Sequence, residues 1–177
     1  MVVRDRNLEN LKTNLVIFFS IILAGFTLDR ILKHIVFSKE YLGGSTPVIG
    51  HILYITPTTN TGAAFGLMKG AAGFLTWLSL ALLLAIIFSM KIWAEHRQYS
   101  IILGMIGAGI LGNLYDRLIY GFVLDFIDIK IWPVFNLADS LMSIGCAAIA
   151  LTIIFDSFCQ NSHKKSVFRK KSGSKTR

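Results

Sequence analysis

A block of twenty residues without a charged side chain occupies residues 71–90 and reads AAGFLTWLSLALLLAIIFSM. A helix of that length is about 30 Å long, which matches the hydrocarbon core of a bilayer. A helix of a soluble domain is normally apolar on one face only. We therefore predict that residues 71–93 span a membrane.

Three further segments are long and apolar enough for the same role: about residues 14–37, 100–120 and 136–158. Of the 177 residues 54% are hydrophobic and 16% charged, and the mean hydropathy is +0.61, whereas soluble domains carry about 25% charged residues. The first apolar run lacks a small-residue cleavage site, so we expect it to be retained. The predicted fold is a mainly α integral membrane protein with four transmembrane helices in one domain, residues 1–160, and extracytoplasmic segments 38–70 and 121–135.

The net charge of +8 is concentrated on one predicted side of the membrane. Lysines and arginines flank the cytoplasmic ends of transmembrane helices, so this side is predicted to be cytoplasmic and to hold both termini. In a bacterium the protein would be a multi-pass protein of the inner membrane. Residues 161–177 form a basic cytoplasmic tail that we expect to be disordered. No nucleic-acid-binding module accompanies the tail, so its predicted partner is membrane lipid and not nucleic acid. The basic residues on this side are Arg4, Arg6, Lys12, Lys91, Arg97 and seven in the tail, against Lys39, Lys69 and Lys130 on the other.

The extracytoplasmic segment 38–70 is too long for a simple connection. Residues 48–56, VIGHILYIT, are rich in β-branched and aromatic side chains and lie between Pro47 and Pro57. This pattern predicts one short strand. Residues 63–68, AAFGLM, are predicted to form a short helix after the turn residues Asn60 to Gly62. We therefore expect a small β-containing platform outside the membrane.

Charged residues within the predicted helices indicate polar sites, because they are costly in a membrane. Asp29 and Lys33 are four residues apart on one helical face. They can form an ion pair that only orients the helix end, or they can support a nearby polar site.

The third predicted helix combines close packing with a polar end. Gly104, Ala108 and Gly112 recur every four residues, which favours close approach of a neighbouring helix. Adjacent Asp116 and Arg117 cannot face one direction on a helix, so each needs its own partner. With Asn113 they form a polar group that either holds loops or positions a substrate or a catalytic acid. The sequence leaves both possibilities open.

Two further acids, Asp125 and Asp139, flank a short loop that returns the chain to the membrane. Asp139 follows Asn136 at the start of the last helix, where it can be part of an N-cap or of a site. Asp125 lies among apolar side chains, which favours a raised pKa. Two carboxyl groups that share a site do not both ionise easily, so one can act as an acid while the other activates water. The four histidines lack ligand spacing, and we predict no metal and no other cofactor.

Two non-peptidase interpretations fit the same residues. Intramembrane carboxylates relay protons in transporters and channels, although those carboxylates are normally spread through the membrane depth. In a noncatalytic scaffold, the polar groups would only hold helices together.

Four motifs in order, LDRILK (28–33), NTGAAFG (60–66), GNLYDRL (112–118) and VLDFID followed by FNLADS (123–140), resemble those of the bacterial lipoprotein signal peptidases, or signal peptidase II. The resemblance implies an intramembrane aspartyl endopeptidase that cleaves diacylglyceryl-modified prolipoproteins before the lipidated cysteine. It implies Asp125 and Asp139 as catalytic residues, inhibition by globomycin-type antibiotics, and a monomer. The family more often has glutamine where this chain has Arg30, which we expect to point away from the Asp29–Lys33 face. The supporting or substrate-binding residues that the resemblance implies are Asn60, Gly62, Asn113, Arg117, Asn136, Asp29 and Lys33.

Overall fold

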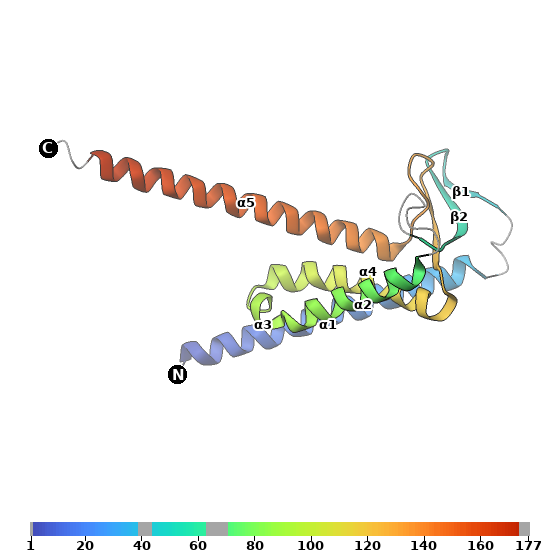
Figure 1. Cartoon of the computed structure of the whole chain (residues 1–177), viewed down its shortest axis with the longest axis horizontal. Helices are drawn as coiled ribbons and strands as arrows, with labels where there is room; N and C mark the ends of the chain where they lie inside the picture. The colour runs from blue at the N-terminus through green and yellow to red at the C-terminus, as the bar shows by residue number, and fades with distance from the viewer. Residues whose placement is uncertain (1, 39–43, 63–70, 174–177) are drawn as a thin grey trace.

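A computed structural model describes residues 2–38, 44–62 and 71–173 of the chain. The helices run side by side, and a small sheet lies across one end of them, while both termini lie at the opposite end (Figure 1). The short helix predicted for residues 63–68 falls outside the described residues. The elements in chain order are α1 (Val2–Val36), β1 (Thr46–Ile49), β2 (Leu53–Asn60), α2 (Ala72–Phe88), α3 (Met90–Trp93), α4 (Arg97–Tyr120), β3 (Val123–Asp128) and α5 (Leu137–Gly173).

Helix α4 is the centre of the helical layer and packs against α1, α2 and α5. It can do so because small residues line it, as the sequence predicted. At Gly109 an added methyl group would collide with the carbonyl oxygen of Ala138 in α5. The buried small residues of α4 include Gly104, Gly107, Ala108, Gly109 and Gly112.

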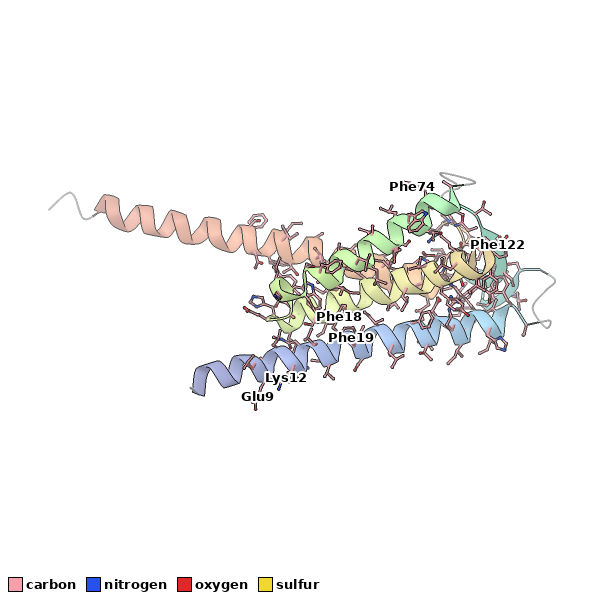
Figure 2. The ribbon with its side chains drawn as sticks, turned by 60° about the horizontal axis from the view of Figure 1, so that its bottom comes forward. Glu9, Lys12, Phe18, Phe19, Phe74 and Phe122 are labelled. Atoms are coloured by element: carbon pink, nitrogen blue, oxygen red, sulfur yellow. The ribbon has the colours of Figure 1, made fainter. Side chains whose placement is uncertain are left out.

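Within the described parts of the chain, three helical segments are long and apolar enough to cross a membrane: residues 8–36, 97–120 and 137–158. The fourth predicted span is shorter than expected, because α2 has 17 residues and ends at Phe88. Ser89 Oγ and Trp93 Nε1 both donate to the carbonyl oxygen of Ile86, at 3.1 and 2.9 Å, and turn the chain into α3. Trp93 then packs on Phe18, which lies on α1 (Figure 2).

Helices α1 and α5 both extend beyond the spans that the sequence predicted. α1 begins at Val2 and not near residue 14, and α5 continues to Gly173, so the expectation of disorder is wrong for residues 161–173 of the tail. Neither extension contains proline, and no glycine interrupts the second one before Gly173. Nothing in these stretches therefore breaks a helix once it has started.

The platform is a three-stranded antiparallel sheet in the order β1-β2-β3. The single strand predicted for residues 48–56 is a hairpin, because Gly50 adopts a left-handed φ of 48° and reverses the chain. Pro57 lies inside β2, where the pairing with β3 shifts register between Ile55 and Thr58. At such a shift the strand does not require a hydrogen bond from the N–H that proline lacks. β3 was not predicted, and its pairing places Thr58 opposite Asp125.

Candidate active site

Two asparagines connect Asp125 and Asp139. The side-chain amide nitrogen of Asn136 donates to Asp125 Oδ1 at 2.7 Å and to Asn113 Oδ1 at 3.1 Å. The amide nitrogen of Asn113 donates in turn to Asp139 Oδ1 at 2.7 Å. The four residues come from β3, α4 and the start of α5. The structure thus gathers into one hydrogen-bonded chain the two aspartates that the sequence analysis paired and the two asparagines assigned to support them.

The start of α5 explains how Asp139 is oriented. The backbone N–H of Asp139 donates to Asn136 Oδ1 at 2.9 Å, and the backbone N–H of Asn136 donates to Asp139 Oδ2 at 3.2 Å. This reciprocal pair has the form of a helix capping box. The N-cap interpretation of the sequence is therefore compatible with the site interpretation. Asp139 uses Oδ2 for the cap and Oδ1 for the hydrogen bond from Asn113.

Asp125 is 2% exposed and has polar neighbours on both oxygens. Asn60 donates to its Oδ2 at 3.2 Å, and the amide N–H of Gly62 donates to Asn60 Oδ1 at 3.0 Å, which fixes the direction of the Asn60 amide. The pKa of Asp125 is raised to about 6: burial and then the charge of Asp139 raise it, and the hydrogen bonds from Asn60 and Asn136 oppose the rise. The upward direction agrees with the apolar surroundings in the sequence.

Both aspartates line a cavity of about 380 Å³. The cavity lies between α2, α4 and α5, and the loop before α5 closes one side of it. Its lining is largely apolar, with Arg117 as its cation, and it is large enough for a peptide segment. Among residues 2–38, 44–62 and 71–173, no three histidine, cysteine or acidic side chains are grouped to hold a metal ion. The lining includes Asn60, Gly62, Asn113, Arg117, Asp125, Asp139, Leu75, Leu78, Leu82 and residues 132–135.

Asp29 and Lys33 do not line this cavity and instead belong to a buried ion cluster. Lys33 Nζ lies 3.0 Å from Asp29 Oδ2 and 2.6 Å from Asp116 Oδ2. The expectation that Arg30 points away from this face is wrong: its guanidinium bonds Asp29 at 2.6 Å and Asp116 at 2.5 Å. The long side chain reaches across to α4, and with Lys33 it supplies the two cations that balance the two buried carboxylates of Asp29 and Asp116.

The ion cluster holds the backbone next to each aspartate. Asp116 Oδ2 accepts a hydrogen bond from the N–H of Leu124 at 3.1 Å, and Asp29 Oδ1 accepts one from the N–H of Ala138 at 3.1 Å. Leu124 and Ala138 directly precede Asp125 and Asp139. Sequence reasoning noted that Asp116 needed a partner but missed this role, since the hydrogen bonds span distant segments.

Comparison with known proteins finds relatives over most of the chain. The family model described as signal peptidase (SPase) II matches residues 21–155, a range that contains both aspartates. A lipoprotein signal peptidase of Syntrophomonas wolfei is 41% identical over 133 residues, 73% of this chain and 87% of the relative. One of Desulfitobacterium hafniense is 37% identical over 133 residues, 74% and 88% of the two chains.

The fold is also similar to a solved one. A bacterial membrane enzyme determined by the in meso method at 2.3 Å resolution superposes with a TM-score of 0.72 and 31% identity, over 82% of this chain and 90% of that one. The structural comparison therefore agrees with the family match. The apolar helices are those of a membrane-embedded protein. With the motifs, the matched range and the fold in agreement, the chain belongs to the signal peptidase II family.

Proposed function

We propose that this protein is an intramembrane aspartyl endopeptidase that removes signal peptides from diacylglyceryl-modified prolipoproteins, cleaving before the lipidated cysteine. The observation that carries the proposal is the hydrogen-bonded chain from Asp125 through Asn136 and Asn113 to Asp139, within one cavity. The names of the relatives give the substrate class. The two carboxyl groups supply an acid and a base without a nucleophilic side chain or a cofactor.

The proposed mechanism gives the two aspartates different protonation states. Asp125, with a pKa raised to about 6, keeps the proton. Asp139 stays ionised, because the helix N-terminus and Asn113 stabilise its negative charge. Asp139 takes a proton from water as the water oxygen attacks the scissile carbonyl carbon, while Asp125 protonates the carbonyl oxygen. The tetrahedral intermediate then collapses: one of its hydroxyl groups returns a proton to Asp125 as the carbonyl re-forms, the C–N bond breaks, and the leaving amine takes the proton held by Asp139. Because the two carboxyl groups interact, the pair loses its two protons in two separate steps.

The other cavity residues bind and orient the substrate in this proposal. Arg117 provides donors for backbone carbonyl groups of the peptide. Gly62 is buried and has no side chain, so the substrate backbone can approach it closely. The leucines of α2 form an apolar wall that suits the transmembrane signal peptide and the acyl chains. Globomycin-type inhibitors would occupy the same cavity.

The proposed topology places the sheet and the cavity on the extracytoplasmic side of the bacterial inner membrane. Support comes from the basic residues at the other end of the helices, and from the position of both termini at that end (Figure 1). In this arrangement residues 1–160 work as one domain and as a monomer, and α5 carries its basic end into the cytoplasm. The scissile bond meets water at the outer boundary of the membrane.

Cleavage of a diacylglyceryl prolipoprotein by the purified protein in lipid or detergent tests the proposal. Asp125→Asn and Asp139→Asn are each expected to abolish turnover, since each removes one proton-transferring group. Asp128→Asn is the matched control, because Asp128 lies in the same strand but pairs with Lys130 at 2.8 Å and does not line the cavity. Full activity in either of the first two variants refutes the assignment. Turnover is also expected to survive strong chelation, and its loss would argue for a metal.

A further inference from the structure

A second cavity, of about 540 Å³, lies on the other side of the wall that carries Asp125. Leu124 lines this groove, whereas its neighbours Val123 and Asp125 line the active cavity. The division follows from the alternation of side chains along a strand. α4 divides in the same way, with Asn113 toward the active cavity and Tyr115 toward the groove. The two cavities are therefore separate and share one wall.

The groove has the position and the aromatic lining of a lipid-facing interface site. Its walls come from the ends of α1 and α4 nearest the sheet, where spanning helices meet the headgroup region. Tyr120 is 46% exposed and stacks on Phe122 at 6.1 Å, and Phe122 lies at this end of the molecule (Figure 2). Tyrosine is enriched at this depth because its ring is apolar and its hydroxyl is polar.

At the mouth of the groove the acids are buried, whereas Arg30 is partly exposed. The acids of the ion cluster, Asp29 and Asp116, are fully buried, whereas the side chain of Arg30 is 18% exposed. The Arg30 guanidinium lies 4.7 Å from the centroid of the Tyr115 ring, and exposed His34 stands one helical turn further along α1. The cluster is neutral as a whole, and the Arg30 guanidinium is its partly exposed member, so a ligand in the groove meets the cation before the acids.

We propose that this groove binds a phospholipid of the surrounding bilayer, with the headgroup phosphate at Arg30 and His34 and an acyl chain along the aromatic floor. An apolar floor beside the partly exposed Arg30 and the exposed His34 fits the two parts of one lipid molecule. A bound phosphate would restrain Arg30, which holds Asp116, and Asp116 holds the backbone of β3 at Leu124. The lipid would thereby steady the strand that carries Asp125 without entering the active cavity.

Native mass spectrometry of the full-length protein, titrated with phosphatidylglycerol in detergent, tests the proposal without any turnover measurement. The wild type is expected to retain one lipid molecule. His34→Glu places a carboxylate at the mouth and is expected to weaken binding about tenfold or more, the size of one charge-assisted contact. His51→Glu is the matched control, since His51 is also exposed but lies in the β1–β2 turn, and it should bind like the wild type.

Three outcomes overturn the inference. If the two variants bind the lipid with equal affinity, the phosphate does not lie at His34. Displacement of the lipid by millimolar inorganic phosphate identifies a site for a soluble anion. Displacement by a synthetic diacylglyceryl peptide, one for one, makes the groove part of the substrate site. The test measures lipid binding and not cleavage. Its result is therefore independent of whether the peptidase proposal holds.

Discussion

Replacement of Asn60 by leucine tests how the hydrogen bond from Asn60 affects the pKa of Asp125. The Asn60 amide donates to Asp125 Oδ2 at 3.2 Å, and this hydrogen bond favours the ionised carboxylate. Leucine has a similar volume and keeps water out of the position, so the ionised form loses a donor and gains nothing. The pKa of Asp125 must therefore rise.

The size of that rise follows from the energy of one such contact. A hydrogen bond to a charged group contributes about 1.5 kcal/mol or more, and one pKa unit corresponds to about 1.4 kcal/mol. From a pKa of about 6 in the wild type, the variant should titrate near 7, about one unit higher. If protonated Asp125 is the acid, activity is lost as the pH rises through this pKa, so the alkaline limb of the profile moves toward higher pH.

The assay is kcat/KM for prolipoprotein cleavage between about pH 5 and 9, a range that brackets the expected limb. Thr56→Val is the control, because it removes a hydroxyl that donates to Asp128 at 2.8 Å on the same pair of strands but outside the cavity. Its profile should match that of the wild type. An alkaline limb that stays in place in Asn60→Leu, or moves to lower pH, refutes the role of Asp125 as the protonated acid.

Two further substitutions test the framework of the site. Asp116→Asn is expected to destabilise the fold by about 3 kcal/mol, because it leaves Lys33 short of a buried counter-charge; a lower thermal unfolding midpoint in detergent is the readout, and an unchanged midpoint contradicts the buried cluster. Gly109→Ala should separate α4 from α5 by collision with the Ala138 carbonyl and reduce both stability and cleavage, whereas Gly73→Ala, which meets open space, should do neither. Equal behaviour of the two alanine variants would contradict the close packing.

The helices were predictable because their signal is local. A long apolar block with flanking charges has few alternatives to a membrane-spanning helix, and the four-residue spacing of small side chains in α4 marked its packing face. The shortening of α2 was not visible, since it depends on the hydrogen bonds of Ser89 and Trp93 to one carbonyl group.

The sheet and the hydrogen bonds within the site were harder to predict from the sequence, because they depend on pairing between distant segments. In β3, VLDFID, apolar residues lie on both faces, so the strand lacks simple alternation. The two aspartates were identifiable as candidates from their apolar or helix-end surroundings. The bridge through Asn113 and Asn136 and the reach of Arg30 across to α4 required the folded arrangement.

The order of the elements along the chain has a consequence for biosynthesis. Asp125 and Asp139 lie in the last strand and the last helix, after α1, α2 and α4. A chain emerging from the ribosome therefore inserts three of its four apolar helices before either carboxyl group has been made. In the proposed mechanism, hydrolytic capacity arrives only when α5 docks on α4 and closes its capping box with Asn136, so an incompletely synthesised chain in the membrane would be inert toward its neighbours.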